Sequence, residues 1–376
     1  MSTIMARHPE KVLFIAAISL MLVGIVVIYS ASGPYCQFLN PPQPTWHYLA
    51  RQASWAVVAL IAMFIMYRLN YHVIVKFSPI FLVLTLLALA TVLVVSRGEI
   101  KRWIYIAGFT FQPSEFFKIA YVAFMAKMAA KNAKEKFSYK KYATVMAAMV
   151  LGAGFIIKEP DLGTTTLVVG VAVALLFLAG FPKKVIFITS VVFAFVACIL
   201  VFVMKYEIDR IDQYAITLTD PFNTGASYQT RQALVSLGSG GILGKGLGNG
   251  AQKHLFLPAR HTDFILAAAA EEGGILIVIG ILALFCLLGW AGYRIAKSAM
   301  DIEGQFFAWG IMLFLVLQAT VNIGVAMGVF PITGMTLPFL SYGGSSLLVC
   351  SVGVGMIASV SRQSKSPQHY FHRFKK

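Results

Sequence analysis

Charged side chains are scarce in this sequence, and acidic ones are the scarcest. Asp, Glu, Lys and Arg together make up 12% of the 376 residues, and only 15 of those are acidic, whereas soluble domains carry roughly a quarter charged residues. Hydrophobic residues reach 59%, and the mean hydropathy is +0.78. These proportions exclude a soluble globular protein and predict a membrane protein.

Cysteine is rare as well, and its positions suggest neither disulfides nor metal binding. Cys198, Cys286 and Cys350 lie inside apolar runs, and Cys36 is the fourth. Because no His or Cys recurs at zinc-ligand spacing, we predict no metal site built from protein ligands alone. The net charge of +16 comes from Lys and Arg scattered between apolar runs. That pattern argues against nucleic acid as a partner and fits contact with membrane lipid.

Apolar runs long enough to span a bilayer organise the whole chain. An all-α membrane protein is predicted, a polytopic bundle of about ten transmembrane helices within one integral domain covering residues 1–376. The first run is too long for a signal peptide and is interpreted as a retained helix. The runs lie near Val12 to Ser30, Gln52 to Met66, Val75 to Val95, Ser114 to Ala130, Tyr142 to Ile157, Leu162 to Gly180, Val185 to Met204, Glu272 to Ile295, Phe306 to Ala326 and Ser345 to Val360.

Lys and Arg concentrate in the short connections that face the cytoplasm if the N-terminus does, which predicts both termini inside. Residues 363–376 then form a short basic cytoplasmic tail, and residues 205–262 form a large extracytoplasmic loop between helices 7 and 8. A loop of that length is expected to be functional. Residues 97–115 are either an interfacial aromatic belt or a functional outer segment, and residues 329–346 are interpreted as an irregular re-entrant segment facing a cavity.

Ionisable residues beside spanning helices are functional candidates. Glu115 and Lys118 are three positions apart and can pair on one helical face. Asp161 follows Pro160 at the start of a helix, so it is either a helix N-cap or a functional carboxylate. The glycine-dense stretch from Leu237 to Gly250 contains Lys245 and can approach a phosphate closely, although it is not a Walker A loop.

The string LPARHTDF, from Leu257 to Phe264, brings Arg260, His261, Thr262 and Asp263 to the point where the large loop re-enters the membrane. A partly desolvated carboxylate at such a boundary has a raised pKa, which a neighbouring cation lowers. Asp263 is therefore the candidate general base.

These motifs together resemble the SEDS family (shape, elongation, division and sporulation) of integral membrane peptidoglycan glycosyltransferases. The resemblance runs through nearly the whole chain. It is carried by KRWI from Lys101, FQPSEFFK from Phe111, EPDLGT from Glu159, the glycine loop with LPARHTDF, and GMTLPFLSYGGSS from Gly334.

The resemblance implies polymerisation of lipid II into glycan strands, with Asp263 as the catalytic base and undecaprenyl pyrophosphate as the leaving group. Glu115 and Asp161 either orient basic residues or help hold a divalent cation, Mg or Mn, on the pyrophosphate; no organic cofactor is expected. Lys101 is a further candidate contact to the pyrophosphate. The residues expected to bind substrate are Arg102, Glu115, Lys118, Asp161, Lys245, Arg260, His261, Thr262 and Ser341.

The family resemblance also implies a class B penicillin-binding protein transpeptidase and other divisome proteins as partners, in the bacterial inner membrane at the division septum. GMTLP and the pair Gln252 and Lys253 favour the FtsW branch, for septal synthesis, over the RodA branch, for elongation. Glu159 stands where glutamine is common in the family. A lipid II flippase is the rival interpretation, and clustering of the ionisable residues on the outer side favours the enzyme. Gly324 and Gly328 can seat a partner helix or serve internal packing.

Overall fold

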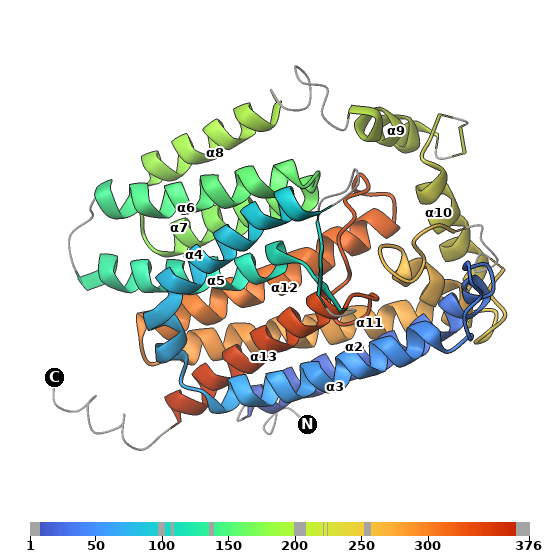
Figure 1. Ribbon diagram of the computed structural model, residues 1–376, viewed down its shortest axis with the longest axis horizontal. Coiled ribbons are helices and arrows are strands. Elements are labelled where there is room, and N and C mark those ends of the chain that lie inside the picture. Colours follow the sequence, from blue (N-terminus) through green and yellow to red (C-terminus); the bar gives the residue numbers. More distant parts are fainter. Residues whose placement is uncertain are drawn as a thin grey trace.

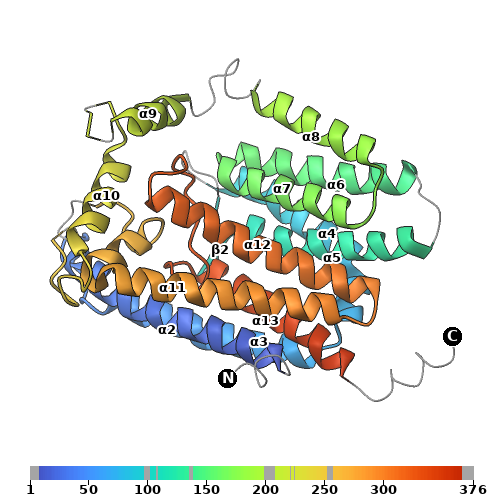
Figure 2. The same cartoon turned by 180° about the vertical axis from the view of Figure 1, so that it is seen from behind.

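The computed structural model describes residues 8–96, 102–106, 109–134, 139–198, 208–220, 222–223, 225–251 and 257–365. Lys101, Gln252, Lys253 and the basic tail beyond residue 365 lie outside these ranges. The described chain is a bundle of long helices with one two-stranded hairpin (Figures 1 and 2).

Each of the ten predicted apolar runs overlaps a helix of the described chain. In chain order these helices are α2 (Pro9–Cys36), α3 (His47–Arg68), α4 (Tyr71–Val95), α5 (Pro113–Lys134), α6 (Tyr139–Lys158), α7 (Leu162–Leu178), α8 (Lys183–Cys198), α11 (Ile265–Ser298), α12 (Ile302–Ala326) and α13 (Gly344–Ser364). Seven of the described helices are long and apolar enough to cross a membrane by length and composition alone. The prediction of a polytopic helical membrane protein is confirmed.

The core of the bundle is formed by α13 and α12, which the other helices surround. Helix α13 packs along α3, α11 packs along α2, and α12 packs against α5 and α11. Small residues make the α13–α3 contact close: a Cβ on Gly344 would collide with the indole of Trp55, and one on Gly355 with the backbone of Met63. The outward faces of α3 and α4 carry exposed apolar side chains, as a lipid-facing surface requires.

Helix α11 begins well before the start predicted near Glu272, and that boundary was wrong. Glu271 and Glu272 stand near the start of the predicted run, and both side chains are buried. The helix instead bends at Gly274, whose φ of 66° favours glycine. Just after the bend, the backbone N–H of Ile275 donates to the carbonyl of Gly241, which belongs to the glycine loop.

The large loop contains two helices of its own, α9 (Ile208–Thr219) and α10 (Tyr228–Gly240). They lie at one end of the molecule, while α2 starts and α13 stops at the other (Figure 1). The interpretation of residues 97–115 as a simple aromatic belt was incomplete, because strands β1 (Ile104–Ile106) and β2 (Phe109–Phe111) pair there in an antiparallel hairpin. Gly324 serves internal packing, since a Cβ there would collide with the ring of Phe330.

Candidate active site

A polar cavity of about 350 Å³ opens at the end of the bundle where α9 lies. Its walls come from the β hairpin, α5, the turn before α7, the large loop, the turn before α11 and the irregular segment 329–343. Five of the predicted site residues line it: Arg102, Glu115, Asp161, Thr262 and Asp263. The structure therefore brings together residues from four separate motifs, and the predicted irregular segment does face a cavity.

Hydrogen bonds hold the backbone on both sides of Asp263. It ends a tight turn in which Thr262 and Phe264 donate their backbone N–H groups to the carbonyl of Ala259, at 3.0 and 3.2 Å, while Ala259 adopts a φ of 50°. The side chain of Asn322, on α12, donates to the carbonyls of Asp263 and Met335, at 2.9 and 2.7 Å. One buried amide thus fixes the turn that carries Asp263 against the irregular segment.

The environment of Asp263 raises the pKa of its carboxyl group to about 6. Burial is the largest cause, because it penalises the charged form. Arg102 and Arg210 oppose this shift, whereas the negative charge of Asp161 adds to it. A carboxyl group with this pKa is mostly ionised at neutral pH and still basic enough to accept a proton, as a general base must be.

Arg102 is fixed across the cavity by backbone oxygens. Its Nε donates to the carbonyl of Glu159 at 3.0 Å, and its terminal nitrogen donates to the carbonyl of Pro160. A second terminal nitrogen lies 3.9 Å from Oδ2 of Asp161. Gly334 keeps the space between Arg102 and Asp263 open, since a Cβ there would lie 3.2 Å from the guanidinium.

Asp161 is a helix cap and also lines the cavity. Its Oδ1 accepts from the backbone N–H of Thr164 at 3.0 Å, and its Oδ2 accepts from the Thr164 hydroxyl at 2.9 Å. The helix-cap alternative is confirmed, and a functional role for this carboxylate stays a prediction. The neighbouring Glu159 is fully buried, and burial raises the pKa of its carboxyl group to about 9, so it is neutral at pH 7.

Glu115 and Lys118 form the predicted pair, at 2.9 Å, and both side chains are buried. Lys118 also donates to the side-chain oxygen of Gln318 at 2.7 Å, and Gln318 donates to the carbonyl of Thr336 at 2.9 Å. Lys118 lies behind the cavity wall, where it connects α5, α12 and the irregular segment.

Ser341 also lies behind the cavity wall, where its hydroxyl links two of the motifs by hydrogen bonds. Its hydroxyl donates to the carbonyl of Thr262 at 2.6 Å and accepts the backbone N–H of Leu337 at 2.8 Å. The next residue, Tyr342, donates its backbone N–H to the carbonyl of His261 at 2.8 Å. The segment FLSY thus supports the turn that carries Asp263.

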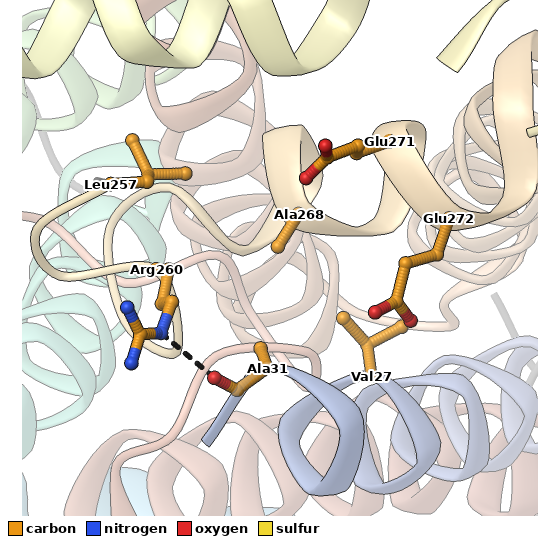
Figure 3. Close-up of a pocket in the computed structure, with 7 residues that line it drawn as sticks. All are labelled: Val27, Ala31, Leu257, Arg260, Ala268, Glu271 and Glu272. Atoms are coloured by element: carbon orange, nitrogen blue, oxygen red, sulfur yellow. Dashed lines mark hydrogen bonds between the residues drawn. The ribbon is translucent and has the colours of Figure 1, made fainter. Parts of the chain in front are cut away.

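Besides Lys118 and Ser341, three more predicted substrate-binding residues lie outside the lining of this cavity: Lys245, Arg260 and His261. Lys245 pairs with the buried carboxylate of Glu271 at 2.8 Å. Arg260 points the other way, into a small cavity beside Glu271 and Glu272, and donates to the carbonyl of Ala31 at 2.8 Å (Figure 3). Burial lowers the pKa of Arg260.

His261 packs among the rings of Tyr35, Tyr48 and Tyr342. Burial lowers the pKa of its imidazole to about 4, so this histidine is neutral at pH 7.

Sequence reasoning missed Arg210, Gln318 and Asn322. Arg210 lies on α9 and lines the cavity, but in the sequence it is one of several charges in a long loop. Gln318 and Asn322 had a usable signal, because uncharged polar side chains inside an apolar run commonly bond across helices. Their four-residue spacing puts both on one face of α12.

The cavity fits a divalent cation only together with substrate oxygens. In the described ranges, no cluster of three acidic, His or Cys residues is placed to hold a metal ion. Asp161 already accepts two hydrogen bonds, and Glu115 is paired with Lys118. A carboxylate has about four acceptor sites, so Asp161 can still contact an ion, and Mg²⁺ is commonly bound through one or two carboxylates plus phosphate oxygens.

Comparison with known proteins places this architecture in a family. A family model described as "Cell cycle protein", for FtsW, RodA and SpoVE, matches residues 10–366. The chain is 36% identical to "Stage V sporulation protein E" of Bacillus subtilis, over 95% of this chain and 98% of that one. It is 38% identical to "Probable peptidoglycan glycosyltransferase FtsW" of Geobacter metallireducens, over 95% of both chains.

Solved structures agree. A chain of "Structural coordination of polymerization and crosslinking by a peptidoglycan synthase complex" superposes with a TM-score of 0.74, at 25% identity over 94% of this chain and 98% of that one. Rod shape determining protein RodA of Thermus thermophilus gives 0.69, at 26% identity over 94% and 97%. The resemblance to the SEDS family is confirmed, and the chain belongs to the family of cell cycle proteins that includes FtsW, RodA and SpoVE.

Proposed function

We propose that this protein is a peptidoglycan glycosyltransferase that polymerises lipid II at the outer face of the bacterial cytoplasmic membrane. The observation that carries this proposal is the buried carboxyl group of Asp263, with its pKa of about 6, in a polar cavity that also holds Arg102 and Arg210. The names of the relatives support the same activity, since several are called peptidoglycan glycosyltransferases.

In the proposed reaction, Asp263 accepts the proton of the acceptor sugar 4-hydroxyl. The oxygen then attacks C1 of the donor sugar, and the bond from C1 to the pyrophosphate oxygen breaks, with the electron pair leaving on undecaprenyl pyrophosphate. Arg102 is rigidly held and is suited to the negative charge that grows on the leaving group, because a preorganised cation stabilises developing charge without moving. Arg210 supplies a second cation in the same lining.

A lipid-linked donor needs an apolar site beside the polar one. An apolar cavity of about 390 Å³ lies between α7, α12 and α9, and it shares Arg210, Ile332 and Met335 with the polar cavity. A polyprenyl chain in the apolar cavity would bring its pyrophosphate to Arg210. This arrangement favours a donor that enters from the membrane.

A divalent cation, Mg or Mn, is proposed to bind with the substrate through pyrophosphate oxygens and the carboxylate of Asp161, which also lines the cavity, so that Asp263 stays available as the base. When bound, it would neutralise charge on the leaving group. For the partner, we infer a class B penicillin-binding protein transpeptidase. The structural relative belongs to a complex that coordinates polymerisation and crosslinking. We further propose work at the division septum with divisome proteins, because several relatives carry the name FtsW. The distribution of Lys and Arg supports both termini in the cytoplasm.

The activity is tested with purified protein and fluorescent lipid II, with and without the transpeptidase and Mg²⁺ or Mn²⁺, by following glycan ladders on a gel. Asp263→Asn removes the base while keeping the shape of the side chain. The control is Asp212→Asn, which removes an exposed carboxylate of α9 that lines neither cavity.

We expect ladders from the wild type and from Asp212→Asn. We expect none from Asp263→Asn, although its melting temperature should equal or exceed that of the wild type. Polymer from Asp263→Asn at the wild-type rate would remove Asp263 from the mechanism. No polymer from the wild type with every component present would favour the flippase instead.

A further inference from the structure

A second polar cavity, of about 300 Å³, lies at the end of the bundle away from Asp263. It is bounded by the first residue of α2, the last turns of α11 and the C-terminal end of α13 (Figure 2). Its lining is Pro9, Arg294, Lys297, Ser298, Ser361, Ser364 and Lys365. Three cationic side chains and three hydroxyls thus converge from helix ends that are distant in sequence.

The three cations of this cavity are only partly neutralised by the described part of the chain. Lys365 is held by both carboxylate oxygens of Glu10, at 2.8 Å each. Arg294 and Lys297 have no carboxylate partner in the described part of the chain; each instead lies over an aromatic ring, of Trp290 and of Tyr293, at 5.9 Å from the ring centre. One acidic side chain therefore faces three basic ones, and the cavity attracts an anion.

The cavity lies where lipid headgroups would be. Trp290 and Tyr293 are partly exposed on α11, and Trp and Tyr are enriched at the membrane–water interface. On α2, Ile15 and Ile18 are exposed apolar residues further along the helix, which would face acyl chains. The cations thus lie at the helix ends, and exposed apolar side chains follow further along α2.

We propose that this cavity binds the headgroup of an anionic phospholipid in the leaflet on the side of the chain termini. Arg294 and Lys297 donate to the phosphate, Arg through its planar fork and Lys as a point charge. Lys365, positioned by Glu10, provides the third positive charge. The ligand class is a phosphodiester with acyl chains, such as phosphatidylglycerol, and the site would join α2, α11 and α13 through one bound lipid.

The test titrates phosphatidylglycerol into the full-length protein in neutral detergent, with binding measured by native mass spectrometry and by the rise in melting temperature. The test variant is Arg294→Gln with Lys297→Gln. The matched control, Lys183→Gln with Lys184→Gln, removes two exposed cations from the start of α8, on the same predicted side of the membrane. Phosphatidylcholine tests the need for negative charge, and soluble glycerophosphoglycerol tests the need for acyl chains.

Loss of two cations is expected to weaken phosphatidylglycerol binding about thirtyfold, since each Lys or Arg near an anionic surface contributes about 1 kcal/mol. The control should bind like the wild type, and phosphatidylcholine should bind weakly to all three proteins. Equal binding by the test variant and the wild type would overturn the proposal, as would equal binding of both lipids. Tight binding of glycerophosphoglycerol would show a site for a soluble anion and refute the assignment to a lipid.

Discussion

Lowering the assay pH from 7 to 5 should titrate Asp263, because burial raises the pKa of its carboxyl group to about 6. A base with that pKa is ionised in about ten of eleven molecules at pH 7 and in about one of eleven at pH 5, so the rate should fall roughly tenfold. At the ordinary Asp pKa of about 3.9, the same change would cost less than about 10% of the rate.

The measurement is kcat/KM for lipid II polymerisation between pH 5 and 8, with melting temperatures taken at each pH. Asp161→Asn tests the electrostatic cause. The amide can still cap α7, but it lacks the negative charge that raises the pKa of Asp263. In this variant, the fall of kcat/KM on the acid side should therefore occur at lower pH than in the wild type. In Asp212→Asn it should occur at the wild-type pH. A rate that is flat down to pH 5 would refute the assignment of Asp263 as a base with a raised pKa.

The same shift predicts a stability cost at Asp263. Its pKa is higher in the folded protein than in the unfolded one, so ionisation opposes folding above pH 6 and not below pH 4. The difference between about 6 and the ordinary Asp pKa of 3.8 corresponds to roughly 3 kcal/mol. Asp263→Asn should therefore raise the melting temperature at pH 8, and the gain should vanish near pH 4. A melting temperature lower than wild type at pH 8 would contradict this.

Three further substitutions are informative. Glu159→Gln should leave activity and melting temperature unchanged at pH 7, because this buried carboxyl group has a pKa of about 9 and is already neutral; a large loss of activity would mean that it ionises. Gly152→Ala should lower the melting temperature, because its Cβ would collide with the ring of Phe117. Gly154→Ala should not, because nothing lies within 4 Å of its Cβ. Equal melting temperatures for the two variants would contradict this packing. Arg260→Gln should lower kcat and the melting temperature with little change in KM for lipid II, because the side chain holds the turn to α2 and faces away from the cavity; a selective rise in KM would instead indicate substrate contact.

The sequence by itself determined the membrane fold, because spanning helices depend on a local property. Each run of apolar residues must satisfy its own backbone hydrogen bonds in lipid, so hydropathy alone locates the helix. Local rules also predicted the pair of Glu115 with Lys118 and the cap formed by Asp161, both of which depend on residues three positions apart. The motif resemblance identified the family for a different reason. Five motifs in a fixed order are specific to one family, and recognising them needs no three-dimensional information.

Tertiary structure decided which motif residues share a cavity. Arg260 and Asp263 are three residues apart, yet the turn at Ala259 sends one side chain toward α2 and the other toward Arg102. Arg210 reaches the same cavity because the large loop folds into α9, which no local pattern predicted. The direction of a side chain at a turn or a bend depends on contacts with distant segments, and those contacts exist only once the bundle has packed.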